Sequence, residues 1–154
     1  MKYEKALGQR PILAGSAQDI IDQYAALGAV LAAQSPPPDT SVETRNESAD
    51  GVPVRIYTPP GAAGKKLPLA VYLHGGGYLV GDLNTEDPWC RLIAKETPCI
   101  VVSVDYRLST EHKLPVMLDD SVTAFKWVSP PSLYFPNVFL IHNIGTPECG
   151  RARS

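Results

Sequence analysis

Apolar residues in the first 35 positions follow the period of a helix. They recur three and four residues apart, at Ile20, Tyr24, Leu27 and Leu31. Ser16 precedes this run, and Asp19 lies three residues after Ser16. This spacing resembles a capping box with a shorter acid. The helix is expected to end before the three prolines at 36–38, because proline donates no hydrogen bond and restricts the residue before it. These prolines predict an extended connector.

From residue 41 the helical period changes to strict alternation. The alternating positions are Val42, Thr44, Val52, Val54 and Ile56. Between them lies Asp50-Gly51, a dipeptide typical of tight hairpin turns, so two antiparallel strands are predicted. Residues 67–73 and 100–104 are nearly continuous apolar runs of strand length. Such runs indicate strands covered on both faces, as in a parallel sheet.

Two further helices are predicted, one between these two strands and one after them. The first covers residues 85–97 and carries its apolar face at Trp89, Leu92 and Ile93. The second begins near Pro115 and carries its apolar face at Leu118, Val122 and Phe125. The order helix, hairpin, strand, helix, strand, helix predicts an α/β protein with parallel crossovers.

The regular pattern stops after Val128. The 26 residues from Ser129 contain four prolines, and only the apolar patch at 138–144 could form a strand. We therefore expect a helix with its linker at 1–40, an α/β segment at 41–128, and an unrelated or disordered tail at 129–154.

Composition narrows the classes of function. A length of 154 residues suits one domain, and 44% hydrophobic against 19% charged residues can build a core. A net charge of −2 gives no reason to expect nucleic acid as a partner. No apolar run reaches the ~18 residues of a membrane span and the start lacks a secretory signal, so a cytoplasmic protein is expected. Cys90, Cys99 and Cys149 lack metal-ligand spacing, and we expect free thiols and no metal.

A glycine motif, His74-Gly75-Gly76-Gly77-Tyr78, directly follows the strand predicted at 67–73. Consecutive glycines are used where φ must be positive or where a ligand approaches the main chain. At the carboxyl end of a parallel strand, that ligand could be a dinucleotide, with Asp105 as the ribose-binding acid. The spacing opposes this use, because Val80 stands where the third glycine is required. The following helix start is also acidic, with Asp82, Glu86 and Asp87 where a pyrophosphate would lie.

The other use of the glycines is an oxyanion hole. A tetrahedral intermediate of acyl transfer places negative charge on the former carbonyl oxygen, and fixed backbone amides stabilise that charge by ~3 kcal/mol each. A histidine followed by three glycines, in the loop after the third strand, is the form this hole takes in lipases and esterases.

A second motif follows the first along the chain. It consists of Asp105-Tyr106-Arg107-Leu108, with Glu111 and Pro115 after it. Together the two motifs resemble the hormone-sensitive-lipase-like esterases, group three of the α/β-hydrolase fold. The resemblance spans roughly residues 41–128 and implies an incomplete α/β-hydrolase fold, the N-terminal half of the domain. It also implies that residues up to about 35, within the 1–40 segment, belong to a cap over the acyl site, and that the substrate is a small carboxylic ester. No cofactor is expected.

The resemblance assigns roles to the glycine motif. The amides of Gly76 and Gly77 would form most of the oxyanion hole, His74 and Gly75 would support the loop, and Tyr78 would line the pocket. The family's Gly-x-Ser-x-Gly nucleophile elbow is missing, since none of the ten serines has glycine two residues away on both sides. No catalytic residue is identified. We therefore expect an inactive, truncated form of a carboxylic ester hydrolase, or alternatively a non-catalytic protein that binds a small ligand on the same scaffold.

Other polar residues receive structural interpretations. Asp105 and Arg107 are expected to pair and brace the loop beside the site. Asp119 and Asp120 are expected to complement a helix dipole. His112 and His142 lack a ligand-spaced partner, His142 precedes the place of the family's catalytic histidine, and Cys149 has no visible base.

Overall fold

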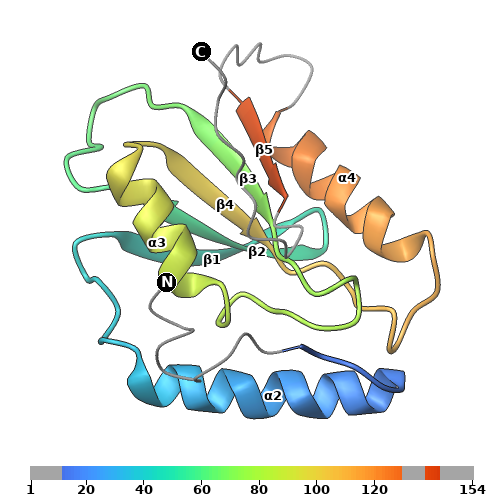
Figure 1. Cartoon of the computed structure of the whole chain (residues 1–154). Helices are drawn as coiled ribbons and strands as arrows, with labels where there is room; N and C mark the ends of the chain where they lie inside the picture. Colours follow the sequence, from blue (N-terminus) through green and yellow to red (C-terminus); the bar gives the residue numbers. More distant parts are fainter. Residues whose placement is uncertain (1–11, 130–137, 143–154) are drawn as a thin grey trace, which may run out of the picture. The chain divides into compact units, whose positions relative to one another are not determined.

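The computed structural model describes residues 12–129 and 138–142. The chain divides into two units, Met1–Pro36 and Pro37–Ser154, and each is described by itself. The first contains one described helix, and the second contains a sheet with two helices (Figure 1).

The helix of the first unit, α2 (Ala17–Gln34), begins at a capping box as predicted. The Ser16 amide donates to Asp19 Oδ2 at 2.8 Å, and the Asp19 amide donates to Ser16 Oγ at 3.2 Å. The helix ends before Pro36, and its predicted apolar positions are half-buried. Among the residues that the structure describes, no helix is long and apolar enough to cross a membrane.

The second unit contains a five-stranded sheet. Its strands are β1 (Glu43–Ala49), β2 (Val52–Thr58), β3 (Leu69–Leu73), β4 (Ile100–Val104) and β5 (Val138–His142). They lie in the order β1-β2-β4-β3-β5. The hairpin between β1 and β2 turns at Asp50 (φ 50°) and Gly51 (φ 94°), as the sequence predicts. Strands β3, β4 and β5 are parallel, and β2 joins them antiparallel to β4. The strand β5 occupies the first five residues of the apolar patch at 138–144.

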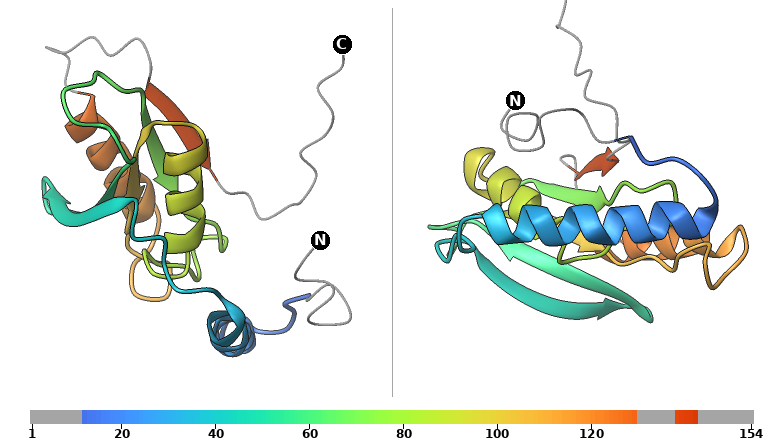
Figure 2. Two further views of the ribbon diagram at one scale, coloured as in Figure 1. Left: turned by 90° about the vertical axis from the view of Figure 1, so that its left-hand side faces the viewer. Right: turned by 60° about the horizontal axis from the view of Figure 1, so that its bottom comes forward.

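Two helices, α3 (Asp87–Glu96) and α4 (Val116–Val128), cover opposite faces of the sheet (Figure 2). Because side chains alternate along a strand, neighbouring residues of β3 enter different cores. Ala70 and Tyr72 pack on the α3 side with Cys90 and Ala94. Val71 packs on the α4 side, in a core completed by the residues Val54, Val102, Val104, Met117 and Ala124.

The predicted apolar face of α4 is not the face that meets the sheet, and the predicted face of α3 meets it only at Ile93, which packs with Cys90 and Ala94. Trp89 and Leu92 of α3 are 46% and 47% exposed, whereas Cys90 and Ala94 are buried. The three predicted positions of α4 are also exposed: Leu118, Val122 and Phe125. Each helix carries a second stripe of smaller or more flexible side chains, and that stripe packs closely on the sheet. The element types were therefore predicted correctly, whereas the buried face was predicted wrongly for α4 and correctly only at Ile93 for α3.

Burial is expected to make the Cys90 thiol unreactive in the folded chain. Its side chain is fully buried, and burial raises the pKa of the thiol to about 12, because the thiolate is disfavoured away from water. We expect Cys90 to remain unmodified by a disulfide reagent at pH 8 and to react fully in guanidinium chloride. Peptide mass mapping after timed labelling measures both. Labelling of Cys90 at the rate seen in denaturant would contradict this burial.

Candidate active site

The site predicted from sequence lies where the direction of the crossovers changes. The chain leaves β3 toward α3 on one face of the sheet and leaves the neighbouring β4 toward α4 on the other face (Figure 1). The two loops that leave β3 and β4 therefore lie beside each other at the carboxyl ends of parallel strands. In open α/β sheets this is the position where ligands bind.

The glycine motif, residues 74–78, adopts a backbone that few sequences could follow. Gly76, Gly77 and Tyr78 all have positive φ, at 112°, 61° and 64°. A Cβ at Gly76 would overlap the carbonyl oxygen of Val80, whereas a Cβ at Gly77 would have no atom within 4 Å. The two glycines are thus required for different reasons. At Gly76 the Val80 backbone approaches too closely for a side chain, whereas at Gly77 only the positive φ favours glycine.

Amides of the residues that directly follow the motif hold it through the Gly76 carbonyl group. The Gly76 carbonyl accepts from the amides of Leu79 (3.0 Å) and Val80 (3.3 Å). Within the described part of the chain, no hydrogen bond has the Gly76 or Gly77 amide as its donor. Because the peptide group is planar, fixing the Gly76 carbonyl also fixes the direction of the Gly77 N–H. This arrangement leaves two adjacent backbone donors for an acceptor outside the loop.

His74 anchors the start of the motif inside the protein. Its side chain is 1% exposed, and its Nδ1 lies 2.9 Å from the Gly75 carbonyl oxygen, so that nitrogen is the donor. Gly81 packs against the same edge of the ring, since a Cβ there would overlap Nδ1. Gly81 has φ 109° and was not predicted as part of the site. The sequence does contain a sign of this role, because Gly81 is a fourth glycine only four residues after Gly75-Gly76-Gly77.

Tyr106 was also missed as a contact of the motif. It is 3% exposed, and its ring stacks on His74 with centroids 4.0 Å apart. The Tyr106 hydroxyl donates to the His74 carbonyl oxygen at 2.7 Å, and the Tyr78 ring meets the Tyr106 ring edge-on. Further along the same loop, the Ser109 amide donates to the Tyr78 carbonyl oxygen at 2.7 Å. The loop after β4 therefore holds both ends of the glycine motif.

The expected pairing of Asp105 with Arg107 is wrong. The Arg107 guanidinium binds Asp120, with Nε to Oδ2 at 2.9 Å and Nη2 to Oδ1 at 2.7 Å. The Arg107 amide also donates to Asp120 Oδ2 at 3.0 Å. Asp120 lies in α4 and is 4% exposed, so it fastens the loop to that helix instead of serving the helix dipole. Asp105 is half-buried, and burial raises the pKa of its carboxyl group.

Replacing Asp120 with asparagine is expected to lower the free energy of unfolding by about 1–2 kcal/mol at neutral pH. Hydrogen bonds between charged groups contribute about this much when one partner, here Arg107, is half-exposed. The hydrogen bond from Arg107 lowers the pKa of Asp120. A carboxyl whose pKa is lower in the folded than in the unfolded chain stabilises the fold above about pH 4 and loses that contribution as the pH falls. The difference between D120N and wild type should therefore shrink in acid. Urea denaturation at pH 7 and pH 3 measures it.

The neighbouring Asp119→Asn is the control for charge alone, because Asp119 is exposed on the same helical turn. It should change stability by less than about 0.5 kcal/mol. Equal effects of D119N and D120N would contradict the fastening role of Asp120.

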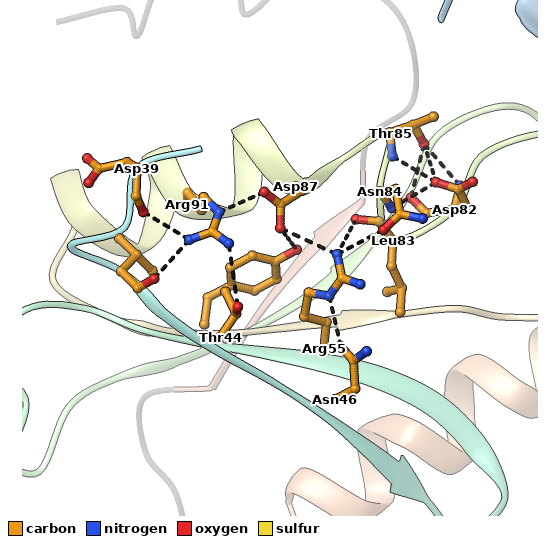
Figure 3. A network of polar contacts seen from close by, with 12 residues as sticks. Asp39, Thr44, Asn46, Arg55, Asp82, Leu83, Asn84, Thr85, Asp87 and Arg91 are labelled. Carbon is orange, nitrogen blue, oxygen red and sulfur yellow. Dashed lines mark hydrogen bonds and ion pairs between the residues drawn. The ribbon is translucent and has the colours of Figure 1, made fainter. Parts of the chain in front are cut away.

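The start of α3 is filled by the protein's own groups, which disfavours the dinucleotide alternative. Glu86 is buried and accepts a hydrogen bond from the Tyr72 hydroxyl at 2.6 Å. Asp87 binds Arg91 and Arg55 (Figure 3). Asp82 accepts from the amides of Asn84 and Thr85. These carboxylates occupy the place where a phosphate would have to lie.

Other polar candidates are not brought to the site as a cluster. No group of three or more His, Cys, Asp or Glu side chains that could hold a metal occurs in the described ranges 12–129 and 138–142. His112 lies half-buried in the loop before α4. The backbone of His142 ends β5, opposite Leu73, while Cys149 lies outside the described residues. A hollow of about 450 Å³, lined by Ile56, Leu69, Ile100 and Trp127 among others, lies at the opposite end of β3 from the glycine motif.

Comparison with known proteins shows which proteins this chain is similar to. A family model described as alpha/beta hydrolase fold matches residues 70–140. Versiconal hemiacetal acetate esterase of Dothistroma septosporum is 39% identical over 129 residues, covering 84% of this chain and 39% of that protein. The carboxylesterase NlhH of Mycobacterium tuberculosis is 47% identical over 94 residues, covering 59% of this chain and 29% of that protein.

Solved structures agree with these sequence matches. An esterase from the bacterial hormone-sensitive lipase family superposes with a TM-score of 0.68 at 29% identity, covering 88% of this chain and 42% of that one. A Pyrobaculum calidifontis esterase superposes with a TM-score of 0.66 at 31% identity, covering 84% and 44%. The chain thus spans between 29% and 44% of the length of these relatives. It carries the N-terminal part of an α/β-hydrolase fold, and it is similar in sequence and structure to esterases, including one of the hormone-sensitive lipase family.

Proposed function

We propose that residues 74–78 are the oxyanion loop of a carboxylic ester hydrolase. The observation that carries this proposal is the pair of backbone donors at Gly76 and Gly77, held by a loop that uses its carbonyl groups for its own hydrogen bonds. Both amides would donate to the oxygen that becomes negative when a nucleophile adds to the ester carbonyl. They gain strength as that charge develops, which is how such donors accelerate acyl transfer.

The neighbouring residues have supporting roles in this proposal. His74 and Gly75 brace the loop, since the His74 ring is buried and directed onto the Gly75 carbonyl. Tyr78, half-buried at the end of the motif, lines the acyl pocket. Arg107 acts structurally through Asp120, and Asp105 remains beside the site without a direct part in the chemistry.

We further propose that the 154 residues alone do not turn over esters, because no serine stands in a Gly-x-Ser-x-Gly elbow. The exposed apolar residues of α3 and α4 support this interpretation of the chain as a truncated form. A helix that is apolar on two sides is typical of burial between two layers. Trp89, Leu92, Val122 and Phe125 present such second faces and are 38–49% exposed. The cap at 1–40, the boundary at 128 and the tail at 129–154 stay proposals that rest on the resemblance. Within that tail, β5 pairs with β3 and the family match extends to residue 140, which weighs against the boundary at 128.

A chimeric enzyme tests the proposed function. Residues 1–128 of this chain would be joined to the C-terminal remainder of the M. tuberculosis carboxylesterase, which is 47% identical over the region they share. We expect the chimera to hydrolyse p-nitrophenyl butyrate and to be inhibited by a serine-directed phosphonate, whereas the 154-residue chain gives no turnover above buffer. A folded chimera without activity would contradict the esterase proposal. Robust turnover by the 154-residue chain would contradict its inactivity.

A small-ligand-binding role is the second candidate, and the intact loop without an elbow is the observation that favours it. Saturable binding of butyrate to the 154-residue chain, lost when Gly76 is replaced, would support that role over truncation.

A further inference from the structure

Tyr106 joins the two loops of the site from the β4 side. Its hydroxyl donates to the His74 carbonyl at 2.7 Å, its ring stacks on the His74 ring with an interplanar angle of 13°, and the Tyr78 ring meets it edge-on at 5.8 Å between centroids. At 3% exposure, the side chain is enclosed by the protein. One side chain thus contacts the first and the last residue of the glycine motif.

The hydroxyl contact acts on the backbone at the point where the motif begins. Since the peptide group is planar, a hydrogen bond to the His74 carbonyl also fixes the orientation of the Gly75 N–H. The following glycines have no side chains that could hold the backbone in one conformation, and glycine loses more freedom on ordering than any other residue. Hydrogen bonds must therefore constrain this backbone. The Leu79 and Val80 amides bind its middle, Tyr106 holds one end, and the Ser109 amide holds the other.

We propose that Tyr106 is a positioning residue that sets the Gly76 and Gly77 amides before a substrate binds. This inference rests on the proposed oxyanion role of those amides. Donors that are already oriented stabilise the developing charge without reorganising during the reaction. Tyr106 itself touches no reacting atom and acts through His74 and Tyr78.

Replacement by phenylalanine separates positioning from simple packing. Packing requires the ring, which Y106F retains, while positioning requires the hydroxyl, which Y106F removes. The matched control is Tyr57→Phe, because Tyr57 is a buried tyrosine of β2 whose hydroxyl donates to Asp87 at 3.1 Å, away from the glycine motif.

The test is NMR of the full ¹⁵N-labelled 154-residue chain. For Y106F we expect the order parameters of Gly76 and Gly77 to fall from about 0.85 to below about 0.6, and the amides of Leu79 and Val80 to exchange about tenfold faster. Amides in the β3–β4 ladder, such as those of Val71 and Val102, should keep their exchange rates. Y57F should leave all the loop signals unchanged.

Two NMR outcomes would overturn the inference. One is an unchanged loop in Y106F, and the other is an equal acceleration of loop and ladder amides, which a purely structural role would produce. These measurements need no ester hydrolysis, so they stand even where the chimera is inactive and the esterase proposal fails. In an active chimera, Y106F should lower kcat about tenfold with KM nearly unchanged; an unchanged kcat would also overturn the inference.

Discussion

Replacing Gly76 with alanine is expected to reduce kcat of the chimeric esterase by about 10²–10³, the loss associated with one misplaced oxyanion donor. The new Cβ would overlap the Val80 carbonyl oxygen, and a φ of 112° is one that alanine rarely adopts. The loop must therefore move at Gly76. Because the Gly76 carbonyl also accepts from Leu79 and Val80, that movement would reorient the Gly77 amide as well. Initial rates with p-nitrophenyl butyrate, at saturating concentration, measure the loss.

Gly77→Ala is the matched control, one residue away in the same motif. Gly77 has a φ of 61°, within the left-handed region that other residues enter at a cost of about 1–2 kcal/mol, and its Cβ would meet no atom within 4 Å. The loop can keep its path, so we expect kcat to fall less than tenfold. Equal losses in G76A and G77A would mean that removing a glycine harms the loop generally, and the close approach at Val80 would not be its determinant.

The features that the sequence predicted well are local ones. The capping box at Ser16 depends on residues three positions apart, and the turn at Asp50-Gly51 depends on two adjacent residues that both take positive φ. The glycine motif is equally local, since its need for positive φ follows from its composition. Such features are decided within a few residues, where the chain has few alternatives.

The features that the sequence predicted poorly depend on contacts between distant segments. The carboxylate that binds Arg107 belongs to Asp120, thirteen residues away in α4. Asp105, only two residues from Arg107, does not pair with it. The choice between Leu118 and Met117 as the buried face of α4 depends on which stripe fits the sheet, and both stripes have helical spacing. Tyr106 reaches His74 across 32 positions, which spacing along the chain does not reveal.

Replacing Asp87 with alanine is expected to cost about 3–5 kcal/mol, the largest loss of stability that we predict, because it removes one partner of a mostly buried ion-pair network. The Asp87 carboxylate accepts from Arg91 Nε at 2.7 Å, from the Tyr57 hydroxyl at 3.1 Å and from Arg55 Nη1 at 3.4 Å (Figure 3). The two arginine side chains are only 14% and 18% exposed. In D87A both would remain positively charged in that enclosure, without the carboxylate between them.

The network also explains why the loss should extend beyond one contact. Arg91 reaches from α3 to the carbonyl oxygens of Asp39 and Val42, and Arg55 reaches from β2 to Asn46 on β1 and Asn84 before α3. Asp87 orients both guanidinium groups, so its removal loosens the attachment of α3 to β1 and β2. Since small domains are stable by only about 5–15 kcal/mol, D87A should lower the urea midpoint strongly or prevent folding.

An exposed ion pair on the same helix provides the comparison. Lys95 binds Asp39 at 2.8 Å, but both side chains are nearly half exposed, and such pairs contribute about 0–1 kcal/mol. We therefore expect Lys95→Met to shift the urea midpoint only slightly, and to do so less at 1 M salt. Asp87→Asn should fall between the two, because the amide keeps an acceptor for Arg91 and loses the charge. A urea midpoint for D87A no lower than that for K95M would contradict this prediction. It would show that water replaces the carboxylate around the two guanidinium groups, and that the Asp87 carboxylate does not fasten α3 to the sheet.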